Sequence, residues 1–236
     1  MNKSFNSQIR GGGRTLSSYK GFTLAEVLVT LGIIGVVSAM TVPTLMQNHQ
    51  RKTYVTQLHK VYNELQQAAL QYMTEKNAIN MKEAGINSDA AAVDFIKKYF
   101  KVVQDCGADL SPCFSEKSNY KKLSGVVITT WYGKHHFTLA NGTAIGIYYR
   151  PENQKLLEFW VDINGSQGPN IVGRDLFGLY MYINGVIDDL ALERNFPLTQ
   201  EQREEVFNLV CSPSVKGTGL EGCLGKILND NWEMTY

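Results

Sequence analysis

A single carboxylate, Glu26, interrupts an otherwise apolar run that extends from Phe22 to Val42. A helix of this length would span about 30 Å, which is the thickness of the hydrocarbon core of a bilayer. An ionised carboxylate at the centre of such a helix costs about 2.5–3.5 kcal/mol, so Glu26 calls for a positively charged partner. The chemistry expected here is charge pairing at a membrane. The alternative is a side chain that snorkels to the interface.

Four cysteines form two closely spaced pairs, Cys106 with Cys113 and Cys211 with Cys223. Disulfides are expected if this part of the chain lies outside the cytoplasm. Four cysteines allow three connectivities, and we favour the two sequential pairs because each closes a loop containing Pro or Gly. A zinc site is the rival interpretation, but neither pair has CxxC spacing and no histidine lies nearby. Free thiols are the remaining alternative.

Oxygen-bearing side chains recur in the segment from Asp162 to Phe177. Those that could bind Ca²⁺ are Asp162, Asn164, Ser166 and Asp175. An EF-hand register starting at Asp162 would place Gly173 where the bidentate glutamate is required, so that motif fails. The alternative is a rigid turn in which Asp and Asn bond to the backbone and Gly adopts positive φ. The turn is favoured because few carboxylates converge.

Catalytic and nucleic-acid-binding signatures are missing from the sequence. His135 and His136 are adjacent in a predicted strand, so their side chains point to opposite faces and do not form a joint ligand pair. The sequence contains no nucleophile elbow, HExxH or P-loop. A net charge of +1 and the lack of a basic patch with interleaved aromatics argue against a nucleic-acid partner. We therefore expect a protein that is not an enzyme.

The element that must position Glu26 is a long N-terminal helix. Beyond the apolar run, residues 43 to about 78 continue as an amphipathic helix, weakened locally at Pro43. Its apolar stripe consists of Tyr54, Leu58, Val61, Leu65, Ala68 and Tyr72. This stripe covers less than three heptads, so packing against a sheet of the same chain is favoured over a coiled coil.

The remainder predicts an α+β fold. A second helix is expected at residues 89–101, followed by antiparallel strands whose one face the N-terminal helix covers. The expected strands are 136–139, 143–148, 156–163 and 177–183, with a further one at 126–131. Asn141-Gly142 marks a hairpin between the first two. Short helices are expected within residues 189–210, with Thr199 as an N-cap.

The order Gly21-Phe22-Thr23-Leu24-x-Glu26, followed by about twenty apolar residues and Pro43, resembles a known signal. It is similar to the class III signal of type IV prepilins and type II secretion pseudopilins, over about residues 20–50. The resemblance implies cleavage after Gly21 by a prepilin peptidase and N-methylation of Phe22. It implies that Glu26 serves methylation and filament assembly, and it includes Pro43. Some pseudopilins also bind calcium in a loop of the same region as Asp162–Asp175.

Charge predicts the topology of this segment. The leader carries Lys3, Arg10, Arg14 and Lys20 without an acidic residue, which outnumber Arg51 and Lys52 beyond the apolar run. An excess of positive charge keeps the N-terminus in the cytoplasm. A cleaved secretory signal peptide and a permanent signal anchor are the alternatives, although the apolar core of a signal peptide is shorter, at about 7–15 residues.

Together these patterns predict three regions: a leader (1–21), a transmembrane and assembly helix (22–43), and a globular domain (44–236) outside the cytoplasm. The resemblance implies a pilin-like fold and a structural subunit of a type II secretion pseudopilus or a type IV pilus-like filament. The expected partners are prepilin peptidase, other subunits, and an inner-membrane assembly platform with its ATPase. The alternatives are a filament-tip subunit for adhesion or DNA uptake and, less favoured, a signal-anchored enzyme.

Overall fold

The computed structural model describes residues 21–191, 196–217 and 219–236. The predicted leader therefore lies outside the described residues, apart from Gly21. Helix α1 (Leu24–Glu75) is continuous through Pro43, so the weakening predicted at that proline does not interrupt the helix. Proline removes one backbone donor, and the rest of the helical hydrogen-bond ladder continues on both sides of it.

Two compact units divide the chain between Met46 and Gln47. The described part of the first unit is the beginning of α1, and every residue in it from Gly21 to Met46 is exposed. The second unit, which we call the body, starts at Gln47 and contains the hydrophobic core, whose most N-terminal buried member is Val55. Hydrophobic burial thus stabilises the body, whereas the described part of the first unit buries none of its apolar side chains.

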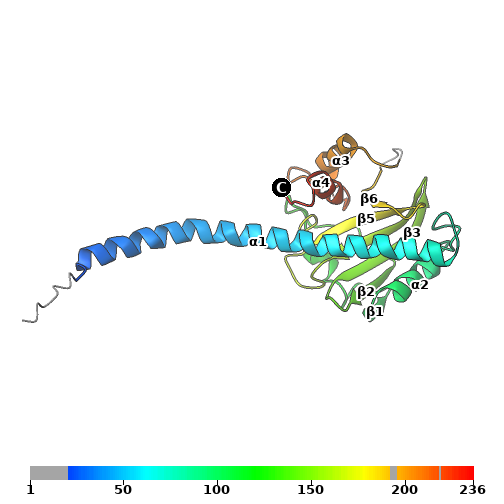
Figure 1. Cartoon of the computed structure of the whole chain (residues 1–236), viewed down its shortest axis with the longest axis horizontal. Helices are drawn as coiled ribbons and strands as arrows, with labels where there is room; N and C mark the ends of the chain where they lie inside the picture. The colour runs from blue at the N-terminus through cyan, green and yellow to red at the C-terminus, as the bar shows by residue number, and fades with distance from the viewer. Residues whose placement is uncertain (1–20, 192–195, 218) are drawn as a thin grey trace, which may run out of the picture. The chain divides into compact units, whose positions relative to one another are not determined.

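A six-stranded antiparallel sheet forms the centre of the body, with the strands hydrogen-bonded in chain order (Figure 1). The strands are β1 (Val102–Gly107), β2 (His135–Leu139), β3 (Ala144–Glu152), β4 (Lys155–Asp162), β5 (Leu176–Tyr182) and β6 (Ile187–Asp188). The α+β class is confirmed, and so are four of the predicted strands. The predicted hairpin joins β2 to β3, with Gly142 at φ +86°, where glycine is favoured.

Sequence reasoning was wrong about the strand at 126–131. Val127 forms an isolated bridge with Lys121, and the backbone of Ile128 donates to the carbonyl oxygen of Tyr120. The segment therefore folds back on residues 120–122 through Gly125, at φ +83°, and does not join the sheet. The edge strands β1 and β6 were missed, because β1 has no buried residue and β6 has only two residues.

The body half of α1 lies across the sheet (Figure 1). Its buried residues are Val55, Leu58, Val61, Leu65, Ala68 and Ala69. The hydroxyl of Tyr62 donates to the carbonyl oxygen of Ile187, 3.2 Å away. A Cβ on Gly185 would lie 2.9 Å from Met73, so the chain before β6 approaches the helix closely. These contacts confirm packing against the sheet of the same chain.

The short helices carry recognisable caps. Ser88 caps α2 (Asp89–Tyr99), and the carboxylate of Asp89 accepts the backbone N–H of Tyr149 in β3 at 2.8 Å. Thr199 caps α3 (Gln200–Val206), as predicted, in a capping box with Gln202. A π-helical turn, η2 (Phe207–Cys211), follows α3. The remaining helices are η1 (Lys117–Asn119) and α4 (Cys223–Asn229), and α4 was not predicted.

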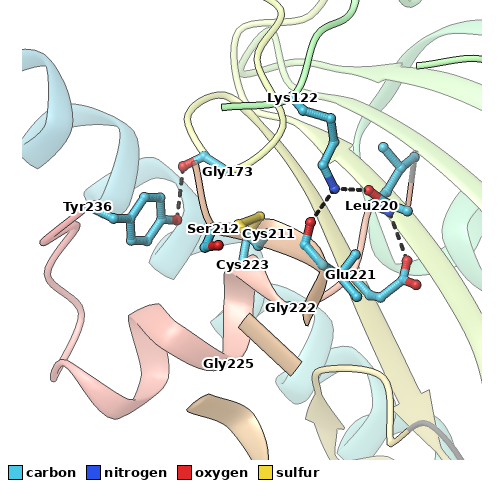
Figure 2. Close-up of a disulfide and its surroundings, with 12 residues drawn as sticks. Lys122, Gly173, Cys211, Ser212, Leu220, Glu221, Gly222, Cys223, Gly225 and Tyr236 are labelled. Atoms are coloured by element: carbon cyan, nitrogen blue, oxygen red, sulfur yellow. Dashed lines mark hydrogen bonds between the residues drawn. A yellow bond between two sulfur atoms is a disulfide. The ribbon is translucent and has the colours of Figure 1, made fainter. Parts of the chain in front are cut away.

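Both favoured disulfides are present, Cys106–Cys113 and Cys211–Cys223, and no described cysteine is free. The second disulfide is buried and packs on the loop between β4 and β5 (Figure 2). A Cβ on Gly173 would lie 2.9 Å from the sulfur of Cys223. The hydroxyl of Tyr236 donates to the carbonyl oxygen of Gly173 at 2.9 Å, so the C-terminal segment holds this loop from a second side.

Candidate functional site

The N-terminus of α1 is closed by a reciprocal pair of side chains, Thr23 and Glu26. Glu26 Oε2 accepts the backbone N–H of Thr23 at 2.8 Å and its hydroxyl at 2.8 Å. In return, the Thr23 hydroxyl oxygen accepts the backbone N–H of Glu26 at 3.2 Å. This is a capping box, which satisfies backbone donors that a helix start leaves unpaired. The Thr-x-x-Glu spacing before an apolar run could have predicted it, but sequence reasoning missed this role.

The carboxylate of Glu26 is only half used by this cap. Both contacts from Thr23 go to Oε2, and among the described residues none reaches Oε1. The negative end group also lies in the first turn of the helix, where the helix dipole favours negative charge. One oxygen therefore fixes the side chain, and the other remains available to a cation from outside the chain.

Three threonine hydroxyls in and just after the apolar run are satisfied within the helix itself. The hydroxyls of Thr30, Thr41 and Thr44 donate to carbonyl oxygens one turn back, those of Glu26, Val37 and Met40. Such back-bonding satisfies these three hydroxyls in a lipid or protein environment without water. At Gly32 and Gly35, an added Cβ would meet nothing within 4 Å, so these positions are open to close approach by another helix.

Large apolar side chains on this helix are exposed to an unusual degree. Phe22 is 86% exposed and Leu24 77%, and the pattern extends through Met46. An exposed apolar surface of this size marks contact with a membrane or with other proteins. By length and composition, α1 is the one described helix that could cross a membrane.

A family model matches this segment over residues 16–42. These residues are a prokaryotic N-terminal methylation motif. The motif is the signature of the prepilin-type signals of type IV pilins and pseudopilins, so the resemblance of the sequence is confirmed. Comparison with curated proteins and with solved structures gave no match. The family match thus covers the N-terminal segment and none of the body.

The motif supports a type IV pilin-like or pseudopilin-type protein. The long N-terminal helix followed by an antiparallel sheet is consistent with a pilin-like fold. The motif implies processing by prepilin peptidase and assembly with other pilins. Together with the apolar helix, it indicates a membrane-anchored protein whose role is structural.

The predicted calcium ligands occupy the loop between β4 and β5, but their oxygens already have partners. Asp162 accepts the hydroxyl of Tyr120 at 2.7 Å and the backbone N–H of Asn164 at 3.2 Å. Asp175 accepts the backbone N–H groups of Asn170 and Ile171, at 2.7 and 2.6 Å. Each carboxylate oxygen thus holds one donor, as in the rigid turn that the sequence favoured.

The remaining ligand candidates do not complete a cation site. Ser166 is exposed, and the amide of Asn164 donates to the carbonyl oxygen of Gly168 at 2.9 Å. Burial raises the pKa of Asp162 to about 8, which favours the neutral acid there over a metal-binding carboxylate, and burial also raises the pKa of Asp175. In the described part of the chain, no three His, Cys, Asp or Glu side chains cluster. The arrangement of these oxygens does not fit a calcium ion. Calcium binding by this loop stays a prediction from the sequence.

The histidine pair behaves as the sequence predicted. His136 is buried, and its Nε2 accepts the indole N–H of Trp131 at 3.0 Å. Burial lowers the pKa of His136, so the neutral ring is favoured. The Nε2 of His135 instead contacts Asp105 in β1, at 2.5 Å. The two rings thus have separate partners and do not converge on a ligand.

A buried lysine was missed by sequence reasoning. Lys122 is 2% exposed, and its ammonium donates to the carbonyl oxygens of Val210, 2.6 Å away, and Gly219. Val210 directly precedes Cys211, and Gly219 lies within the loop that the Cys211–Cys223 disulfide closes. Burial lowers the pKa of Lys122 to about 8, against the opposing influence of Glu221. No local sequence signal separates this lysine from the exposed ones.

Proposed function

We propose that this protein is a structural subunit of a type II secretion pseudopilus or a type IV pilus-like filament. The observation that carries the proposal is the exposed apolar start of α1, which Thr23 and Glu26 cap just after Gly21. In a filament, the apolar surfaces of many such helices would bury one another. The body, with its own core and two disulfides, would form the outer layer.

Glu26 would specify the register between neighbouring helices. Cleavage after Gly21 converts the Phe22 amide into a positively charged amine. In the assembled filament, Oε1 of Glu26 would pair with the amine of a neighbouring subunit while Oε2 remains bound to Thr23. Because an unpaired charge at this depth is costly, helices shifted by a turn would be disfavoured. The open surface at Gly32 and Gly35 would allow the close approach that this pairing requires.

The membrane stage of the pathway follows from charge. The four basic leader residues would hold the N-terminus in the cytoplasm, which places the body on the far side of the inner membrane. An assembly platform and its ATPase would then extract processed subunits into the filament. Two disulfides agree with a body in an oxidising compartment. The large body and its Asp162–Phe177 loop favour the pseudopilin form.

The test is intact mass and N-terminal sequencing of the protein recovered from its native membrane. The proposal predicts a mature chain that starts at N-methylated Phe22. A Gly21→Ala variant, in which the residue before the cut is changed, is expected to remain unprocessed. A start beyond Ala39 would instead identify an ordinary secretory signal peptide, and an intact leader in the wild type would identify a permanent anchor. Either result would overturn the proposal.

Deleting the gene separates the two kinds of filament. Loss of protein secretion without loss of surface fibres supports the pseudopilus, and the reverse supports a pilus. A filament-tip role, in adhesion or DNA uptake, predicts that fibres still form but no longer bind their target.

A further inference from the structure

The structure assigns an anion-binding groove to the body, at the N-terminal end of its part of α1, and we propose that it binds the phosphate of an anionic membrane phospholipid. Arg51 and Tyr54 from α1 and Arg174 from the loop between β4 and β5 line one hollow of about 360 Å³. Gln50 and Gly168 also contribute to its walls. This volume lies within the range of small-ligand sites.

The donors of this groove have no partner inside the described chain. Neither the guanidinium of Arg51 nor that of Arg174 takes part in any ion pair or side-chain hydrogen bond that the described residues make, and the hydroxyl of Tyr54 makes no hydrogen bond there. Elsewhere on the body, Arg203 pairs with Asp188 and Arg150 with Glu158. Two unpaired guanidiniums that share one hollow match phosphate, which accepts bidentate hydrogen bonds from arginine.

The charge around the groove is positive overall. Arg51 also lines an adjacent hollow, together with Lys52 and Glu233. Among the described residues that line the two hollows, three are cations and one is an acid. Asp162 and Asp175 are close enough to influence Tyr54, but both are buried, and burial raises the pKa of each. These positive side chains would attract a phosphate and repel a metal cation.

The C-terminal disulfide fixes one wall of the groove. Gly173, which precedes Arg174, packs against the sulfurs of Cys211 and Cys223 and accepts the hydroxyl of Tyr236 (Figure 2). The backbone N–H of Arg174 donates to the carbonyl oxygen of Ile171 at 2.9 Å. The backbone under Arg174 is thus held from several sides, which lowers the entropy lost when its side chain binds a ligand.

Chain distance favours a lipid as the source of the phosphate. Arg51 follows Val42, the last residue of the apolar run, by nine residues, which extend at most about 30 Å even when fully stretched. In the proposed membrane stage, this short chain distance would bring a lipid headgroup within reach of the groove. Basic residues near an anionic membrane surface each strengthen binding. The groove would hold the body against the membrane until the subunit is extracted, and this role rests on the proposed function.

The test uses the full chain in a neutral detergent and three soluble probes. These are dihexanoyl phosphatidylglycerol, dihexanoyl phosphatidylcholine and inorganic phosphate, each followed by amide NMR shifts of Gly168 and Arg174. We expect saturable shifts with phosphatidylglycerol and much weaker binding of the other two. The variant R51Q/R174Q is expected to bind about 30-fold more weakly, because it loses two basic contacts. The variant R51K/R174K, which keeps the charge, should recover most of the affinity.

Controls separate this inference from general charge effects. The variant K82Q/K117Q removes the same net charge from exposed lysines that do not line the groove, and it should bind like the wild type. Equal weakening in this control, or no saturable shift with phosphatidylglycerol, would overturn the proposal. So would phosphate binding as tightly as the lipid, which would identify a general anion site. Leader cleavage does not enter these titrations, so a failure here is distinct from a failure of the proposed function.

Discussion

The carboxylate of Glu26 accepts both the backbone N–H and the hydroxyl of Thr23, each at 2.8 Å, and so caps the helix that would enter the membrane. One side chain could thereby have two roles. It accepts hydrogen bonds at the start of the helix, and it would neutralise the amine of a neighbouring subunit. These two roles can be separated by mutation.

Glu26→Gln should keep the cap and lose the charge, because glutamine is also a partner in capping boxes. We expect this variant to be cleaved after Gly21 but to assemble poorly, with filament recovery reduced at least tenfold if the charge pair is needed. Glu26→Asp, which keeps the charge on a shorter side chain, serves as the comparison. Normal assembly of Glu26→Gln would show that capping alone suffices. Filament yield by sedimentation and electron microscopy gives the readout.

Thr23→Ala should weaken the cap without removing the charge. Loss of an N-cap side chain costs about 0.5–2 kcal/mol. We expect a several-fold decrease in filament recovery, with Thr23→Ser close to wild type because serine retains the hydroxyl. Equal yields from the alanine and serine variants would mean that the hydroxyl of Thr23 has no role in assembly.

Removal of Lys122 should loosen the C-terminal disulfide loop. In Lys122→Met, the carbonyls of Val210 and Gly219 lose their donor, and we expect a destabilisation of about 1–3 kcal/mol by urea unfolding at pH 7. The folded pKa of about 8 is below the usual value, so the lysine of the wild type adds stability as pH rises from about 8 towards 10.5. The stability difference between wild type and variant should therefore grow over that window. A constant difference would contradict the burial of the charge.

The acid of Asp162 should make stability fall as pH rises. Its folded pKa of about 8 lies above the usual 3.8, so the folded state keeps a proton that the unfolded state has released. The stabilising contribution is complete below about pH 4 and is lost progressively towards pH 8. Asp162→Asn, which mimics the neutral acid, should flatten this slope in urea unfolding between pH 4.5 and 7.5. Asp94→Asn, at an exposed carboxylate, should leave the slope unchanged.

The two disulfides should contribute unequally. By loop-closure entropy, the Cys211–Cys223 bridge is worth about 3 kcal/mol and the shorter Cys106–Cys113 bridge slightly less. The Cys211–Cys223 bridge is also buried against Gly173, so its removal additionally disturbs packing. We expect C211S/C223S to lower the free energy of unfolding more than C106S/C113S. The reverse order, measured by urea unfolding, would contradict this prediction and show that the C-terminal disulfide contributes less to the stability of the body.

Calcium should have little effect on the body, because each carboxylate oxygen of Asp162 and Asp175 already holds a donor. We expect the thermal midpoint to change by less than about 1 °C when CaCl2 is added after EGTA. Calcium at 100 times its Kd would raise the midpoint by about 5–10 °C for a domain of this size. Such a rise, abolished by Asp175→Asn, would establish the predicted calcium site.

The sequence alone determined the N-terminal half of α1, the hairpin at Asn141-Gly142 and the class of the fold. Each of these depends on local pattern: apolar length, turn residues and the period of the apolar positions. The capping box of Thr23 and Glu26 could also have been predicted from the sequence, since its two members are three residues apart. The cysteine pairs could be favoured from spacing because each closes a short loop.

Only the tertiary structure decided which polar residues matter in the body. Lys122 is distant in sequence from the carbonyls that it binds. Arg174 and Arg51 line the same hollow only because β4, β5 and α1 pack together. The loop from Asp162 to Asp175 is a rigid turn, because backbone N–H groups of the loop donate to both carboxylate oxygens of Asp175. Burial and long-range pairing depend on the whole fold, so no local pattern of residues could predict them.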